Sequence, residues 1–345
     1  MKKYLLMSLV SLLLLSCNND EKLIDNTIDN WKLLVSINNE IPRIELISIP
    51  DGAVLNSDIF FNSNEEHLKG IVKKIVEFRD NLYLFIPDLS LIEVVNKDSF
   101  KRVATLDFST QNLAISDICF PNATDAYLTH PNDSVVSLID ITNFQVARTI
   151  KVGKGPTGIV CAGNQIFVAN TYDNSISIID SRTHQQEELL KVAPYPMFID
   201  VTMNGKYAIA ISLGQGKIDS LATKSAAVAT FINIATRKVD YTKELGNATV
   251  RAIDAFPKGI VIPSNLWAFL PVKDYLMQLE TKTGSSILTL KNLGLIYLFY
   301  NYKRNEVVAL KYVNNTYKVA ILNPSNGQSL KEYKINDNTI AIHPI

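Results

Sequence analysis

The chain has 345 residues, 47% of them hydrophobic, so it is long and apolar enough to bury a large core. Lysine plus arginine and aspartate plus glutamate each number 34, which gives a formal net charge of zero. That balance argues against broad electrostatic attraction to nucleic acid, which we therefore disfavour as a partner.

Residues 1–16 are expected to be a secretory signal peptide. The positively charged start MKK precedes an apolar run, Tyr4–Ser16, which is shorter than the ~20 residues that span a bilayer. The run ends in LLSC, which resembles a bacterial lipobox. This resemblance implies cleavage before Cys17 and lipidation of its thiol. An ordinary signal peptide followed by a chance cysteine is the alternative.

Residues 17–30 are polar and predict a tether that carries the lipid anchor. The pair Asp20-Glu21 resembles the acidic surface-export signal of Bacteroidota lipoproteins. We therefore expect attachment to the outer membrane with exposure at the cell surface, and attachment on the periplasmic side is the alternative.

From residue 31 onward the sequence repeats. Each unit has four short runs rich in valine, isoleucine, tyrosine and phenylalanine, separated by turn residues. The first aromatic residues of successive units, which lie 44, 40 and 40 positions apart, are Tyr83, Tyr127, Phe167 and Tyr207. The next interval, to Val261, is 54 residues, and we assign the excess to a loop insertion at Leu213–Ala226.

A four-stranded unit of 40–45 residues is typical of a propeller blade. Residues 31–345 are therefore predicted to form an all-β, seven-bladed β-propeller of four-stranded antiparallel blades. The first unit, Trp31–Phe60, supplies only three strands, whereas the chain ends in one extra strand, Thr339–Pro344. We expect this C-terminal strand to complete the first blade and close the ring.

Two cysteines remain after the leader, Cys119 and Cys161, and both lie in apolar strand-like runs. The favoured interpretation is two small buried hydrophobic side chains without a covalent link. A disulfide in an oxidising compartment is the alternative.

The segment Val152–Asp180, VGKGPTGIVCAGNQIFVANTYDNSISIID, resembles the YVTN repeat. The matching positions are Gly153, Pro156, Phe167–Asn170, Asn174 and Asp180. The chain is also similar to the YncE-like surface lipoproteins of Bacteroidota, including the cobalamin-binding BtuG group. The segment Asn56–Leu68 of this chain resembles the first-blade segment of those proteins. This second resemblance implies a corrinoid ligand and a TonB-dependent transporter as partner.

In a propeller, the turns between second and third strands and the connections between blades emerge on one face, which we call the rim. Aromatic and polar residues in these connections suit recognition of a large, partly polar ligand. The predicted ligand-binding residues are Trp267, Tyr172, Tyr195, His130, Lys154 and Tyr312. Packing at the seams between blades is the alternative role. Asp140 and Asp180, which end third strands, are expected to fix the following turns.

The sequence thus predicts a cell-envelope lipoprotein with a non-enzymatic propeller that binds a ligand or partner and assists an outer-membrane transporter. No catalytic residue, cofactor or resident metal is expected. One alternative is a lactonase-like hydrolase whose channel metal is held by Asp117, Asp200 and Asp254, which recur at similar positions of different units. Another is a scaffold whose rim binds protein or glycan.

Overall fold

The computed structural model describes residues 31–345, apart from residues 50, 215–225, 246–258, 265–266, 273–274, 292–293 and 302. The predicted signal peptide, tether and Cys17 lie outside these residues, as do Asp254 and the side chain of Trp267. Trp31–Ile345 form one compact unit. None of the helices in the described part of the chain is long and apolar enough to cross a membrane.

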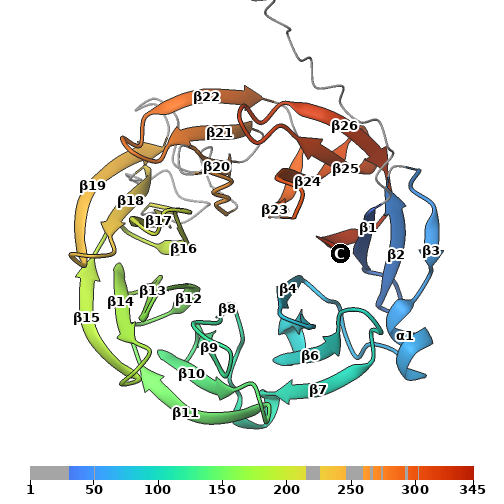
Figure 1. The fold of residues 1–345 in the computed structure, drawn as a ribbon, viewed down its shortest axis with the longest axis horizontal. Coiled ribbons are helices and arrows are strands. Elements are labelled where there is room, and N and C mark those ends of the chain that lie inside the picture. Colours follow the sequence, from blue (N-terminus) through green and yellow to red (C-terminus); the bar gives the residue numbers. More distant parts are fainter. Residues whose placement is uncertain are drawn as a thin grey trace, which may run out of the picture. The chain divides into compact units, whose positions relative to one another are not determined.

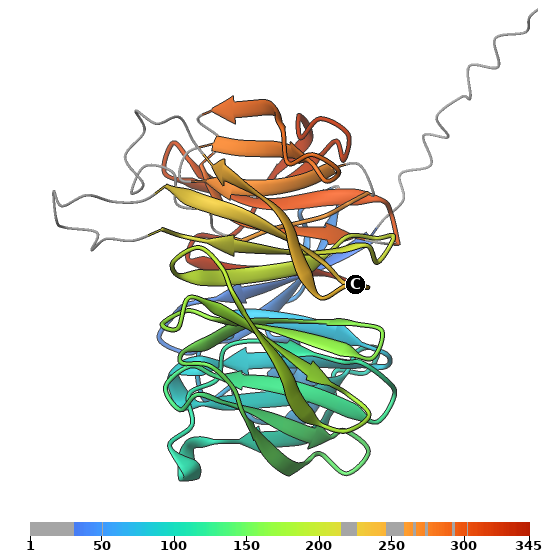
Figure 2. The same cartoon turned by 90° about the vertical axis from the view of Figure 1, so that its left-hand side faces the viewer.

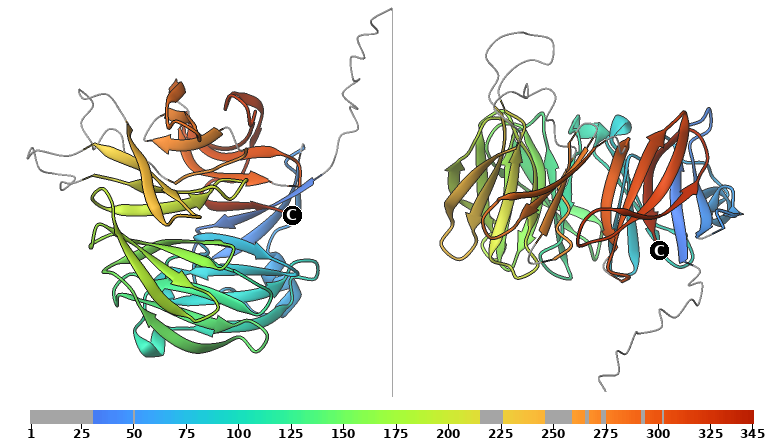
Figure 3. Two further views of the ribbon diagram at one scale, coloured as in Figure 1. Left: turned by 60° about the vertical axis from the view of Figure 1, so that its left-hand side comes forward. Right: turned by 90° about the horizontal axis from the view of Figure 1, so that it is seen from above.

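The described residues form antiparallel sheets arranged around a central axis, as Figure 1 shows. Six sheets have four strands and one has three. Successive sheets lie face to face around the axis, as the turned views in Figures 2 and 3 show. The predicted all-β propeller of four-stranded antiparallel blades is therefore confirmed.

The strands follow one another from the centre of each sheet outward, except in the first sheet. That sheet contains β1 (Trp31–Ile37), β2 (Arg43–Ile49), β3 (Val54–Asn56) and β27 (Thr339–Pro344), and the helix α1 (Ile59–Asn64) follows β3. The next two sheets contain β4 (Lys74–Phe78), β5 (Asn81–Ile86), β6 (Leu91–Asn96) and β7 (Arg102–Asp107), then β8 (Ile118–Cys119), β9 (Asp125–His130), β10 (Val135–Asp140) and β11 (Gln145–Lys151).

The remaining sheets continue the same order. They contain β12 (Pro156–Ala162), β13 (Gln165–Asn170), β14 (Ser175–Asp180) and β15 (Gln185–Lys191), then β16 (Pro196–Val201), β17 (Tyr207–Ser212), β18 (Ala227–Asn233) and β19 (Lys238–Leu245). The last two contain β20 (Trp267–Val272), β21 (Tyr275–Glu280) and β22 (Ser286–Lys291), then β23 (Leu295–Asn301), β24 (Glu306–Val313), β25 (Thr316–Leu322) and β26 (Ser329–Lys334). Single turns of 3-10 helix lie at Pro87–Leu89 and Ser109–Gln111.

The second and third strands of a blade are buried on both faces, because a neighbouring blade covers each face. All six residues of β14 (SISIID) and of β17 (YAIAIS) are buried. The outer strand β15 (QQEELLK) is mostly exposed, which explains its polar composition. The seam between the β4–β7 and β8–β11 sheets buries Tyr83, Phe85 and Leu128. Each such side chain stabilises the fold by about 1.5–3 kcal/mol.

The C-terminal strand closes the ring. β27 pairs antiparallel with β1, with Leu33 opposite Pro344 and Val35 opposite Ile342. Figure 1 shows the first sheet between the β23–β26 sheet and the β4–β7 sheet, with β27 on its inner side. The predicted closure is therefore confirmed, with the predicted bounds.

The repeat marker in the three-stranded sheet was placed wrongly by sequence. The spacing marks Val261 as the equivalent of the aromatic markers in the other units, but the strand beside β21 is β20, and Phe269 occupies the marker position. Val261 instead forms an isolated antiparallel bridge with Phe269, through backbone bonds of 2.9 and 2.7 Å. Both runs, GIVIP and WAFLPV, are apolar and β-branched or aromatic, so composition alone does not tell one from the other.

The favoured interpretation of the cysteines is also wrong: Cys119 and Cys161 form a disulfide, with their Cα atoms 5.8 Å apart. Cys119 lies on β8 and Cys161 on β12, which are the inner strands of consecutive blades. Their separation of 42 residues is about one repeat. The repeat itself therefore places the two thiols side by side, and the bond links two neighbouring blades near the axis.

Candidate functional site

Three of the predicted rim residues lie together. The backbone N–H of Tyr172 donates to the carbonyl of Lys154 at 3.0 Å, and the rings of Tyr172 and Tyr195 meet edge to face with centroids 6.5 Å apart. Tyr172 is 66% exposed and Tyr195 is 40% exposed. We call Lys154, Tyr172 and Tyr195 the rim patch. It spans the connections that lead into β12 and β16 and the turn between β13 and β14.

The backbone holds the rim patch in place at a strained point. Tyr195 has a φ of +59°, a left-handed conformation that bulky residues rarely adopt. Its N–H donates to Asn174 Oδ1 at 3.1 Å, and Asn174 itself has a φ of +51°. Strain of this kind, about 1–3 kcal/mol, persists where the surroundings fix it and is concentrated at functional sites. The exposed tyrosine pair is therefore presented by a rigid backbone.

The glycines of the repeat motif make room for this arrangement. A Cβ on Gly155, which has a φ of +69°, would lie 2.4 Å from Tyr172 Cδ2. A Cβ on Gly153 would lie 2.6 Å from Nδ2 of the buried Asn170. Asn170 Nδ2 in turn donates to the hydroxyls of Ser175 and Ser177. The Gly-x-Gly-Pro run thus serves close packing beneath the rim patch.

The turn-fixing role predicted for two aspartates is confirmed. Asp180 Oδ1 accepts from the N–H groups of Arg182 at 2.7 Å and Thr183 at 3.2 Å. The Arg182 side chain, together with these backbone donors, holds the pKa of Asp180 well below its usual range. Asp140 accepts in the same way from the N–H of Thr142 at 2.8 Å.

The other predicted rim residues do not join the patch. His130 is fully buried: Nδ1 contacts the carbonyl oxygen of Ala114 at 2.8 Å, and Nε2 contacts Ser137 Oγ at 2.7 Å. Its predicted place on a ligand-binding surface is therefore corrected, because the side chain turns into the blade. Tyr312 is 45% exposed but lies on β24, where its ring contacts Tyr317 with centroids 4.8 Å apart.

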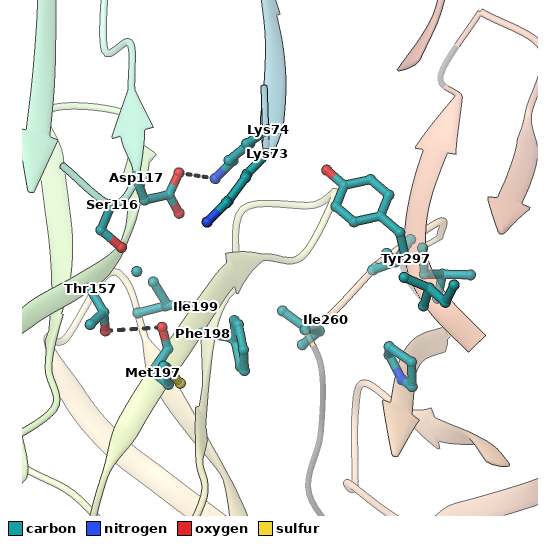
Figure 4. Close-up of a pocket in the computed structure, with 16 residues that line it drawn as sticks. Lys73, Lys74, Ser116, Asp117, Thr157, Met197, Phe198, Ile199, Ile260 and Tyr297 are labelled. Carbon is teal, nitrogen blue, oxygen red and sulfur yellow. Dashed lines mark hydrogen bonds and ion pairs between the residues drawn. The ribbon is translucent and has the colours of Figure 1, made fainter. Parts of the chain in front are cut away.

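The channel at the axis contains a cavity of about 340 Å³ at the end where the inner strands begin. We call it the rim chamber. Its wall includes Lys74 at the start of β4, Asp117 before β8, Thr157 on β12, Phe198 on β16 and Tyr297 on β23. Blade-to-blade connections enter the inner strands at this same end, so the rim chamber lies on the rim face. Figure 4 shows Lys74 and Asp117 facing each other, with Tyr297 on the opposite wall.

An internal ion pair occupies the wall of the rim chamber. The Lys74 ammonium donates to Asp117 Oδ1, which also accepts the N–H of Ile118 at 2.8 Å. Burial, the largest single effect, lowers the pKa of Lys74, but the charge and hydrogen bond of Asp117, together with Tyr297 and Asp200, outweigh it and raise this pKa above its usual value. One of the three carboxylates of the metal hypothesis is thus already neutralised by a lysine.

Asp200, the second of these carboxylates, lies close enough to this pair to interact electrostatically. Its side chain keeps partial access to the channel, but protein atoms surround it, and this burial raises the pKa of Asp200 to about 7. The N–H of Val201 donates to Asp200 Oδ1 at 2.7 Å and opposes the rise. The described residues contain no group of three or more histidine, cysteine, aspartate or glutamate side chains placed to hold a metal ion. Asp254 lies outside them.

A larger cavity, which sequence reasoning missed, lies where the inner strands end. It measures about 620 Å³, and we call it the far chamber. Its aromatic wall consists of Trp31, Phe78, Tyr297, Phe299 and Tyr300. Tyr297 lines both chambers, so it stands between them. The sequence feature that could have indicated this cavity is β23, LIYLFYN, which carries three aromatic residues on an inner strand.

The polar groups of the far chamber converge on Glu77. Its Oε1 accepts from Lys303 Nζ at 3.2 Å and from Lys97 Nζ at 3.4 Å, and its Oε2 lies 3.6 Å from His343 Nε2. The neighbouring His343 and then Lys303 outweigh the effect of burial and lower the pKa of Glu77 to about 2. Glu77 is therefore a carboxylate at neutral pH, and two lysines pair with it.

No protein-family model matches the sequence, and no curated protein matches it. Among solved structures, the chain is similar to hydrazine synthase from Kuenenia stuttgartiensis. The two share 14% sequence identity, the match covers 70% of this chain and 92% of that one, and the TM-score is 0.47.

Proposed function

We propose that the chain is a lipid-anchored, non-enzymatic binding protein of the bacterial cell envelope that captures a ligand on its rim face. The observation that carries this proposal is the exposed tyrosine pair of the rim patch. Tyr172 and Tyr195 are large apolar rings held in one arrangement by backbone bonds and a positive φ. Rigid aromatics with a polar tip bind at low entropic cost and are frequent at binding hot spots.

We further propose that the propeller has seven blades, the three-stranded sheet β20–β22 being one of them. Buried clusters join this sheet to both of its neighbours: one includes Phe231 and Leu270, the other Phe269 and Val307. The bridge between Val261 and Phe269 marks the position of its inner strand. The rim then surrounds the channel on all sides, as the capture of a large ligand requires.

The proposed ligand class is a corrinoid or another large, partly polar molecule, delivered to a TonB-dependent outer-membrane transporter. The rim patch offers two aromatic faces beside the exposed Lys154, and the rim chamber at the axis offers a depression lined by polar and apolar groups. The similarity of the sequence to YncE-like surface lipoproteins supports the same class.

An envelope location is supported by the Cys119–Cys161 disulfide. Such bonds persist in secreted and periplasmic proteins and are rare in the cytosol, where thiols are kept reduced. The signal peptide and lipidated Cys17 inferred from the sequence agree with this location. Labelling of growing cells with a fatty-acid analogue should place lipid on the natural chain and none on a Cys17→Ala variant.

The binding proposal is tested by isothermal titration of residues 18–345 with cyanocobalamin. Tyr172→Ala and Tyr195→Ala should each weaken binding by about tenfold or more, as expected for hot-spot aromatics. Phe61→Ala serves as the control, because Phe61 is 38% exposed but lies on α1, outside the rim patch. Equal affinities of all three variants would overturn the assignment of the rim patch. Absence of heat with any corrinoid would redirect the search to protein or glycan partners, through capture from intact outer membranes.

A further inference from the structure

We infer that the far chamber is a second ligand site, separate from the rim patch, for a small planar molecule that carries a negative charge. Its volume of about 620 Å³ lies within the range of small-molecule sites, about 300–1,000 Å³. Five of its fifteen lining residues are Trp, Tyr or Phe, and its polar side chains include Glu77 with Lys303 and His343 beside it. This inference does not depend on the function proposed for the rim.

The shape of the wall favours a flat apolar body. Phe78 is held against Phe120, with stacked rings 4.2 Å apart, and Phe299 lies nearly parallel to His343 with centroids 6.1 Å apart. Phe78 and Phe299 both line the chamber, and these ring contacts hold them in one arrangement. Planar ligands bind such faces by offset or edge contacts.

The charges of the chamber favour an anion. Among the side chains of its lining are three cations, Arg79, Lys303 and Arg304, and one carboxylate, that of Glu77. Arg304 is paired with Glu306, whereas Glu77 is shared by Lys303 and by Lys97 behind it. The positive charge that remains would be balanced by a ligand carboxylate or sulfonate, through charge-assisted hydrogen bonds.

His343 has a buried ring nitrogen that Glu77 approaches without bonding. Its Nε2 atom is inaccessible to water and has no hydrogen-bond partner within the described part of the chain, since Glu77 Oε2 is 3.6 Å away. Buried polar atoms are nearly always hydrogen-bonded, and those that are not call for an explanation. A small displacement of Glu77 toward His343 would give this nitrogen a hydrogen-bond partner and would free Lys303 to bind the ligand's anionic group.

The test uses residues 18–345, since Trp31–Ile345 close on themselves as a compact unit. The probe is 8-anilinonaphthalene-1-sulfonate, and its matched control is N-phenyl-1-naphthylamine, the same rings without the sulfonate. Fluorescence titration should show tighter binding of the sulfonate. The side chain of Lys303 is 64% exposed. Lys303→Glu should weaken binding of the sulfonate probe by about tenfold and leave binding of the neutral probe unchanged.

Two further variants test the far chamber by the sign and the position of a charge change. Glu77→Gln removes the competing carboxylate and should strengthen sulfonate binding, which is opposite in sign to the effect of Lys303→Glu. Lys331→Glu makes the same charge change on the exposed outer strand β26 and should have no effect. Equal binding of both probes, or a response to Lys331→Glu as large as that to Lys303→Glu, would overturn the site.

Tyr172→Ala should not alter the binding of either probe, which separates this result from that of the rim. Circular dichroism and cooperative melting confirm that each variant is folded.

Discussion

The ring of Tyr172 lies directly over Gly155, so closely that a Cβ on this glycine would come within 2.4 Å of Tyr172 Cδ2. The glycine has a φ of +69°, which L-residues rarely adopt. The exposed aromatic of the rim patch therefore depends on a residue from the preceding blade connection. This contact links the glycine of the repeat motif, with its positive φ, to the exposed ring of the rim patch.

Gly155→Ala is expected to displace Tyr172 and to destabilise the propeller. The positive φ alone should cost about 1–2 kcal/mol, and the clash with the ring adds to it. Gly163→Ala is a close control, because Gly163 has a φ of +58° but a Cβ there would meet no atom within 4 Å. Thermal melting should show a larger loss for Gly155→Ala, accompanied by weaker ligand binding. Equal losses for the two variants would show that the ring contact carries no energy.

Removing the disulfide should destabilise the fold without changing it. The bond closes a loop of 42 residues, for which the chain-entropy model predicts about 4 kcal/mol. Urea unfolding of Cys119→Ala/Cys161→Ala should show this decrease in the free energy of unfolding. A reductant should bring the natural chain to a similar stability and leave the double variant unaffected. A natural chain indifferent to reductant, with its thiols shown to be reduced, would contradict the prediction.

Asp200 should make stability fall as the pH rises. Its pKa is about 7 in the folded chain against an ordinary 3.8, so between about pH 4 and pH 7 the folded state holds a proton that the unfolded chain has lost. Stability associated with this group is complete below about pH 4 and is lost as the pH rises to about 7. The loss is at most about 4 kcal/mol.

Asp200→Asn replaces the titrating carboxyl group by an amide. Comparison of this variant with the natural chain separates the pH dependence due to Asp200 from that due to other carboxylates. Denaturant midpoints at pH 5 and pH 8 should show that the variant gains stability over the natural chain, and that the gain is greater at pH 8. A difference that is the same at both pH values would mean that Asp200 titrates in its ordinary range.

Deleting residues 339–345 should open the ring. The deletion removes β27, exposes the inner edge of β1 and uncovers side chains packed around the buried Ala341 and Ile342. We expect loss of cooperative melting, or a decrease in melting temperature of more than 10 °C, since several kcal/mol of burial disappear. Deleting residues 18–30, which precede β1, is the control and should leave melting unchanged. A stable, cooperative protein without β27 would show that the closure is dispensable.

The fold was largely predictable because blades repeat. Runs such as YAIAIS in β17 are buried along their whole length because the strand is covered on both faces, and the spacing of such runs reveals the four-stranded unit. The final strand was also predictable, because TIAIHP resembles an inner strand without a blade of its own. Where two apolar runs compete, as on either side of Asn265, the repeat gives no criterion, and Val261 was assigned to the wrong strand.

The candidate site was less accessible from sequence. Tyr172, Tyr195 and Lys154 could be placed on the rim because turns are recognisable, but the rotation of His130 into its blade depends on contacts with Ala114 and Ser137. The disulfide could have been predicted by comparing the cysteine separation with the repeat length. The far chamber could not, because Glu77, Lys303 and His343 are more than 200 residues apart at the extremes and meet only when the ring closes.

The pairing of β27 with β1 also has a consequence for biogenesis. β27, which completes the first blade, follows every other described strand in the sequence and is therefore synthesised after them. Closure of the ring therefore has to wait until β27 has been synthesised, and a nascent chain that ends before Thr339 leaves the inner edge of β1 unpaired.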